Sequence, residues 1–256
     1  MPVPRPRAVA GAVTLCLTLA GAGPAAAGSI TALSKADPGL ISSTAGGLSA
    51  GSPGATVSAD GRYVVFVSQA ANVVPGQVEG NNDQDIFSGA DIFLYDRVAG
   101  TNMLVSRSAS SPTTTSNDYS GSPSLSADGS FVLFRSYATD LVAGQVDTGG
   151  TNDLFLFDRA AGTVALVSHA AGSAVTTGNQ ATSDGVLSAD GSYVLFTTYA
   201  SNVAAGVTDT NSTGDVFLYE TATGAVTLVS HSSASLTAAA NAASSYLGGL
   251  SSDGSY

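Results

Sequence analysis

Aspartates six residues apart recur three times in this chain. They are Asp85 and Asp91, Asp147 and Asp153, and Asp209 and Asp215. Around the third pair, the sequence DTNSTGD places oxygen-bearing side chains at alternate positions, namely Asp209, Asn211, Thr213 and Asp215, with a glycine before the last. Ca²⁺ takes roughly six to eight oxygen ligands, and this spacing allows several to converge at a sharp turn. The sequence therefore predicts a Ca²⁺ site in this loop.

The two earlier loops keep the aspartates but lose the residues between them. In the second loop Gly149 replaces the asparagine and Asn152 replaces the glycine. The weaker candidate ligands are therefore Asp147 and Asp153 in the second loop, and Asp85 and Asp91 in the first. The alternative is that the first aspartate of each pair stabilises a turn while the second caps a strand.

Other reactive residue types lack the surroundings that their chemistry needs. His169 and His231 occupy the same place in successive repeats, where Arg107 stands in the first, and no metal-ligand spacing accompanies them, so a recurring surface residue is the expectation. Residues 47–51, GLSAG, match a nucleophile elbow, but such an elbow needs a strand before it and a helix after it. Here both flanks are rich in Ser, Gly and Pro, and Ser49 is not expected to be catalytic. The sequence predicts no catalytic residue in this chain.

These residues belong to a repeated unit. A Ser-x-Asp-Gly phrase recurs with its aspartate at Asp60, Asp128, Asp190 and Asp253. A second phrase follows the first three copies as DIFLYDRVAG, DLFLFDRAAG and DVFLYETATG, and each of these leads into LVS. Repetition at a nearly constant period indicates an architecture built from one repeated structural unit.

Each repeat is predicted to form four short strands. In the third repeat these are residues 186–188, 193–198, 215–220 and 225–230, and Asp-Gly between apolar runs is typical of a hairpin. The strands are apolar on both faces, which indicates that both faces are covered. The sequence thus predicts an all-β propeller of four-stranded blades, with a solenoid as the alternative. The repeats lie near residues 55–106, 122–168 and 184–230, with an incomplete one at 247–256, all within a partial propeller over 55–256.

The unit LSADGSYVLF followed by DVFLYETATGAVTLVS resembles the repeat of TolB-like β-propellers. That family includes translocation scaffolds, binding modules and propellers that precede peptidase domains, so the resemblance implies a fold more than a function. The function predicted first is that of a secreted, non-enzymatic scaffold that binds a protein or another extracellular ligand. The alternative is the propeller domain of a longer hydrolase or peptidase whose catalytic domain lies beyond the C-terminus.

The first residues predict export. Residues 1–27 contain the basic residues Arg5 and Arg7, an apolar stretch at 8–23 and small residues before position 28, as in a signal peptide. The expected location is extracellular or periplasmic. With 8 Lys and Arg against 19 Asp and Glu, the net charge of −11 disfavours binding to nucleic acid, and no membrane insertion is expected after signal cleavage.

Comparison between the repeats also predicts the structure of the remaining segments. Within residues 28–54, residues 30–34 (ITALS) resemble the last strand of a repeat and are predicted to close the ring, and the rest is expected to be a loop. Because closed propellers need about four to eight blades, the chain is expected to be truncated inside the fourth. Asn117, Asn179 and Asn241 are predicted to bond to nearby backbone. Tyr63, Phe131 and Tyr193 are predicted to pack between blades.

Overall fold

A computed structural model describes residues 49–50, 57–81, 89–245 and 250–251 of the 256-residue chain. These residues belong to one compact unit, Leu33–Tyr256. They form strands, turns and bends without a helix, and within these ranges no helix long and apolar enough to cross a membrane is found. The predicted signal peptide at 1–27, the predicted closing strand at 30–34 and Asp85 lie outside the described residues.

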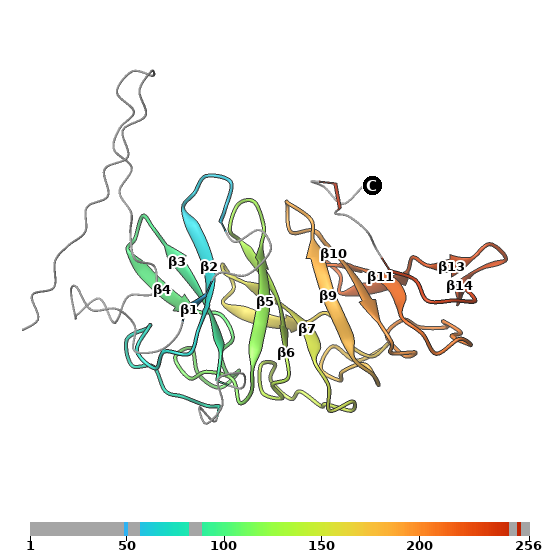
Figure 1. Ribbon diagram of the computed structural model, residues 1–256, viewed down its shortest axis with the longest axis horizontal. Coiled ribbons are helices and arrows are strands. Elements are labelled where there is room, and N and C mark those ends of the chain that lie inside the picture. Colours follow the sequence, from blue (N-terminus) through green and yellow to red (C-terminus); the bar gives the residue numbers. More distant parts are fainter. Residues whose placement is uncertain (1–48, 51–56, 82–88, 246–249, 252–256) are drawn as a thin grey trace, which may run out of the picture. The chain divides into compact units, whose positions relative to one another are not determined.

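Three four-stranded antiparallel sheets follow one another along the chain (Figure 1). The first contains β1 (Ser49–Ala50), β2 (Tyr63–Ser68), β3 (Asp91–Asp96) and β4 (Thr101–Leu104). The second contains β5 (Ser120–Leu125), β6 (Phe131–Ser136), β7 (Asp153–Asp158) and β8 (Thr163–Leu166). The third contains β9 (Thr182–Leu187), β10 (Tyr193–Thr198), β11 (Asp215–Glu220) and β12 (Ala225–Leu228), and a hairpin of β13 (His231–Ser232) and β14 (Ser235–Ala239) follows.

In each sheet the spatial order of the strands is their order along the chain. This antiparallel meander of four strands is the blade of a propeller, which confirms the predicted fold class. The predicted strands at 193–198 and 215–220 coincide with β10 and β11. The predicted strand at 225–230 is two residues longer than β12, because the N–H groups of Val229 and Ser230 both turn to the carbonyl oxygen of Val216 and end the regular ladder.

The first sheet differs from the sequence prediction at its first strand. Residues 49–50 were expected to lie in a loop, but Ser49 and Ala50 pair antiparallel with Ser68 and Val67 of β2. A Ser-Ala dipeptide carries no hydrophobic alternation that could mark a strand. Its position is set instead by the backbone groups on the open edge of β2, which need hydrogen-bond partners.

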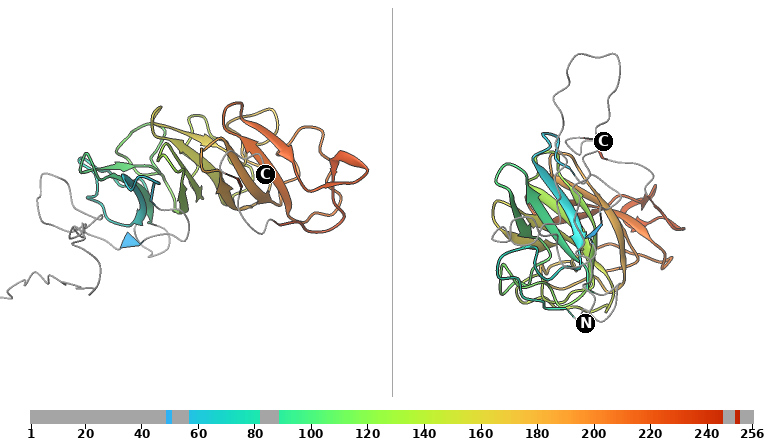
Figure 2. Two further views of the ribbon diagram at one scale, coloured as in Figure 1. Left: turned by 90° about the horizontal axis from the view of Figure 1, so that it is seen from above. Right: turned by 60° about the vertical axis from the view of Figure 1, so that its left-hand side comes forward.

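The apolar strands are covered on both faces, as predicted. Along β7, Phe155 and Phe157 belong to a buried cluster shared with the first sheet, whereas Leu154 and Leu156 belong to one shared with the third. All four side chains are at most 3% exposed. Since successive side chains of a strand point to opposite faces, the run LFLF supplies both of these sheet-to-sheet cores. Figure 2 shows the sheets from two further directions.

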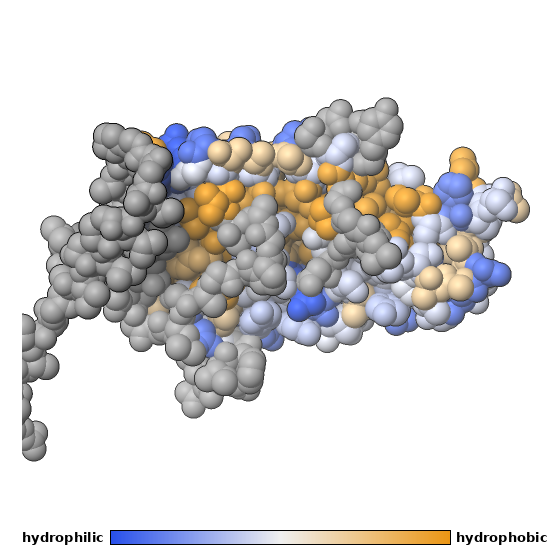
Figure 3. Space-filling view, turned by 45° about the horizontal axis from the view of Figure 1, so that its top comes forward, coloured by the Kyte–Doolittle hydropathy of each residue, from blue (hydrophilic) through white to orange (hydrophobic). Residues whose placement is uncertain are grey.

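Apolar side chains are not confined to the contacts between sheets. Figure 3 shows a band of apolar surface that crosses the sheets and is bordered by polar side chains. Among the exposed aliphatic residues, Val57, Val146 and Val229 are each about half exposed.

The Ser-x-Asp-Gly phrase forms the predicted hairpin turn. In the second sheet Ser126 Oγ donates to Asp128 Oδ1 (2.7 Å), which also accepts the N–H of Ser130 (2.9 Å). The N–H of Phe131 donates back to Ser126 Oγ (2.9 Å), and Gly129 takes a φ of +72°. The same bonds recur at the turns of Asp60 and Asp190.

Two of these turns, at Asp128 and Asp190, also receive the aromatic residue of the preceding sheet. A Cβ added at Gly129 would lie 2.3 Å from the Tyr63 ring, and one added at Gly191 would lie 2.3 Å from the Phe131 ring. Tyr63 is 5% exposed. The prediction that Tyr63 and Phe131 pack between blades is therefore confirmed, and glycine is required in these turns both for its conformation and for the close approach.

Candidate functional site

Each sheet has two different ends. At one end lie the Ser-x-Asp-Gly turns and the short turns between the third and fourth strands. The Ser-x-Asp-Gly turns are at the top of Figure 1. We call this the turn end. At the other end β6 finishes, β5 begins, and the longer connections β4–β5 and β6–β7 run, as do their counterparts in the other sheets. We call this the loop end, and it carries all the candidate aspartates that the structure describes.

The second aspartate of each pair is buried at the start of the third strand of its sheet. Asp153 is 3% exposed, and its Oδ1 accepts a hydrogen bond from Ser168 Oγ (2.8 Å). The same Ser168 oxygen accepts the N–H of Leu154 (3.0 Å). The equivalent bonds join Asp91 with Ser106 and Asp215 with Ser230. This arrangement supports the alternative prediction, in which the second aspartate caps a strand.

Burial changes the acidity of these carboxyls. It raises the pKa of Asp153 to about 7, against the lowering effect of the Ser168 hydrogen bond, and the negative charge of Asp147 adds to the rise. Burial likewise raises the pKa of Asp215, and the charge of Asp209 adds to it. The negative charge of the first aspartate of each of these two pairs thus acts on the second.

The first aspartate of each described pair stabilises a turn. Asp147 Oδ1 accepts the N–H groups of Gly149 (2.9 Å) and Gly150 (2.8 Å). Asp209 Oδ1 accepts those of Asn211 (2.9 Å) and Ser212 (3.1 Å). This too follows the alternative prediction for the pairs.

The candidate ligand side chains of the third loop already make hydrogen bonds to other groups of the protein. Asn211 Oδ1 accepts both the N–H and the hydroxyl of Thr213 (2.7 and 2.6 Å), and its Nδ2 donates to the carbonyl oxygen of Ala240. In the described ranges, no group of three or more His, Cys, Asp or Glu side chains is placed to hold a metal ion. Ca²⁺ binding by Asp209, Asn211, Thr213 and Asp215 stays a prediction.

Arg107 and His169 stand at a position that was predicted to hold a surface residue, but both side chains contact the next sheet. Arg107 Nη2 donates to the carbonyl oxygen of Gly162, at the turn before β8 of the next sheet, and its guanidinium carbon lies 5.2 Å from the centre of the Phe157 ring. His169 Nε2 lies 3.0 Å from the carbonyl oxygen of Gly224, the equivalent residue one sheet further on. Both side chains thus link successive sheets, a role that only the tertiary structure reveals.

The predicted asparagine bonds are confirmed at two positions. Asn117 Oδ1 accepts the N–H of Thr139 (2.9 Å), and Asn179 Oδ1 accepts that of Ser201 (3.0 Å). Each bond ties the segment before the first strand of a sheet to the end of its second strand at the loop end. The asparagines therefore hold the loop end in shape.

Two tyrosines at the loop end were missed by the sequence reasoning. Tyr137 follows β6 and is 45% exposed, and Tyr199 follows β10 at the equivalent position and is 47% exposed. The Tyr119 ring lies beside Tyr137, with 6.5 Å between ring centres. The available signal was the recurrence of Tyr-Ala after the second strand, where the buried alanines Ala138 and Ala200 fix the tyrosines beside them.

Three meander sheets with shared cores, short turns at one end and longer loops at the other define a β-propeller-type protein. No protein-family model matches the sequence, and no curated protein matches it. Among solved structures, it is similar to a putative TolB from Agrobacterium tumefaciens, with 17% identity over 68% of this chain and 47% of that chain and a TM-score of 0.36.

Two further solved structures are similar. One is an oligogalacturonate lyase from Vibrio parahaemolyticus, with 10% identity over 72% of this chain and 41% of that chain and a TM-score of 0.40. The other is hydrazine synthase from Kuenenia stuttgartiensis, with 18% identity over 67% and 40% and a TM-score of 0.32. The chain spans less than half the length of each of the three structures.

Proposed function

We propose that this chain is an exported, non-enzymatic β-propeller that acts as a binding scaffold for a protein or another extracellular ligand at its loop end. The observation that carries the proposal is the exposure of Tyr137 and Tyr199 at the same position of successive sheets. Tyrosine offers a large contact area with a polar tip and is enriched at interfaces. Packed sheets hold such loop residues in fixed positions.

Photo-crosslinking tests this proposal. A photo-crosslinking amino acid in place of Tyr199 should give a discrete adduct with envelope or secreted proteins of the exporting cell. The matched control is the same amino acid in place of Ala160, which is exposed at the turn end of the second sheet. Equal adducts at positions 160 and 199, or no adduct at position 199, would rule out the loop end as the contact surface.

We also propose that Ca²⁺ orders the 209–215 loop. Its support is the electrostatic repulsion between Asp209 and Asp215, which a divalent cation would offset. Added Ca²⁺ should raise the free energy of unfolding, by about 2.7 kcal/mol at a free concentration one hundred times the Kd. The measurement is thermal unfolding in CaCl₂ and in EDTA at neutral pH.

The variant Asp209→Asn provides the control for this ion. Asparagine can still accept the N–H groups of Asn211 and Ser212, so the turn should persist while one charge is lost. We expect the Ca²⁺-dependent rise to shrink in this variant. Identical unfolding curves of the unaltered chain in CaCl₂ and EDTA would exclude a structural Ca²⁺ ion.

A further inference from the structure

A pocket of about 460 Å³ lies where the first sheet meets the outer edge of the second. Its walls are residues 107–112 after β4, residues 141–143 after β6, and residues 162–164 at the start of β8. A volume of this order is typical of sites for small molecules. It was not indicated by any motif in the sequence.

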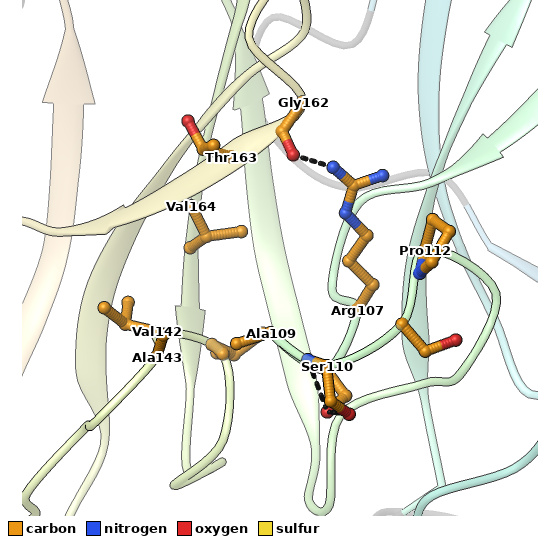
Figure 4. Close-up of a pocket in the computed structure, with 12 residues that line it drawn as sticks. Arg107, Ala109, Ser110, Pro112, Val142, Ala143, Gly162, Thr163 and Val164 are labelled. Carbon is orange, nitrogen blue, oxygen red and sulfur yellow. Dashed lines mark hydrogen bonds between the residues drawn. The ribbon is translucent and has the colours of Figure 1, made fainter.

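The pocket is lined by both apolar and polar side chains. In Figure 4, Val142 and Val164 lie on one side, and Arg107 and Pro112 lie on the other. The hydroxyl-bearing residues Ser110, Ser111 and Thr163 also line it. A ligand that fits this lining combines a short apolar body with a polar group able to accept hydrogen bonds.

Arg107 provides the charge at this pocket. One of its amino groups donates to the Gly162 carbonyl oxygen, and a guanidinium has further N–H donors beyond that single bond. Arg107 is partly buried, so its charge is partly removed from water, and this burial lowers the pKa of the guanidinium. Within the described residues no ion pair neutralises it, whereas Arg62 pairs with Asp96 at 2.8 Å. A partly desolvated guanidinium favours an anionic ligand, above all a planar carboxylate.

The next junction between sheets shows that the fold itself does not require this arrangement. There His169 makes the equivalent link to Gly224. Ala170, Gly172 and Ala225 stand where the first junction has Ser108, Ser110 and Thr163. A histidine therefore satisfies the structural need, and the guanidinium together with the hydroxyls of Ser108, Ser110 and Thr163 is specific to the first of these two junctions.

We infer that this pocket binds a small amphiphilic carboxylate, whose carboxylate pairs with Arg107 and whose short aliphatic or aromatic body packs against Val142, Val164 and Pro112. The site uses neither Tyr137 nor Tyr199. Its test measures the pocket directly and needs no partner at these tyrosines, so it is independent of the test of the proposed scaffold function.

The test is an NMR titration of the full chain with hexanoate, hexan-1-ol and acetate. Hexanoate should shift the amide signals of Gly162 and Val164 in a saturable way. Because the alcohol lacks the charge and acetate lacks the apolar body, the affinity of each should be lower than that of hexanoate by a factor of about ten or more. Equal binding of hexanol, equal binding of acetate, or no saturable shift with hexanoate would each overturn the inference.

Two variants connect the binding to the pocket. Arg107→His, studied at about pH 8 where an unperturbed imidazole is neutral, retains a donor for Gly162 and should weaken hexanoate binding about tenfold. Ala109→Leu narrows the pocket without altering that link and should also weaken binding. Unfolding curves identify any variant that fails to fold, and unchanged hexanoate affinity in a folded Arg107→His or Ala109→Leu variant would contradict the site.

Discussion

Replacing Gly129 by alanine should lower the free energy of unfolding by about 2–4 kcal/mol, well beyond the effect of the same change at Gly61. Both glycines lie in Ser-x-Asp-Gly turns and have nearly equal φ values, +72° and +68°. Only at Gly129 would the new Cβ meet a side chain, at 2.3 Å from Tyr63. That ring cannot withdraw freely, because the Arg159 guanidinium lies over it at 4.2 Å from the ring centre.

Gly61→Ala is the matched control, since among the described residues no atom beyond Gly61 and its chain neighbours lies within 4 Å of the added Cβ. It should cost about 1 kcal/mol from the left-handed backbone alone. Urea unfolding of the two variants gives the comparison. If both lose the same free energy, the contact between Tyr63 and the next turn is not a determinant of stability.

Asp153→Asn should remove most of a pH dependence of stability between about pH 4 and pH 7. The folded state holds a proton on Asp153 up to a pKa of about 7, while the unfolded state releases it near the ordinary aspartate pKa of 3.8. The unaltered chain should therefore lose stability as the pH rises through this window. The loss totals up to about 4 kcal/mol, at roughly 1.4 kcal/mol for each unit by which the pKa is raised.

Asparagine cannot ionise, yet its Oδ1 can still accept the Ser168 hydroxyl. The variant should thus be more stable than the unaltered chain above pH 7 and similar to it near pH 4. Unfolding free energies measured in EDTA over this range test the prediction, with Asp158→Asn at the other end of β7 as control. Parallel pH profiles for Asp153→Asn and the unaltered chain would show that burial does not hold the proton on Asp153.

The sequence by itself determined the repeated unit and its local structure. Burial on both faces was predictable from apolar runs such as LFLF, because two of the four side chains face each way. The Asp-Gly turns were also predictable, since the bonds of Asp128 reach only two residues in either direction. The strands β10 and β11 follow from the same local patterns. β1 did not, because two small residues carry no pattern of their own.

Only the tertiary structure decided the roles of the charged residues that recur in the repeats. Asp153 and Ser168 are 15 residues apart, and Arg107 reaches a carbonyl oxygen 55 residues further along the chain. Whether an aspartate is buried, or an arginine lies at the wall of a pocket, depends on which sheet packs against it. Burial and its effect on charge are properties of that packing, so the acidic and basic residues gained their roles only in the assembled sheets.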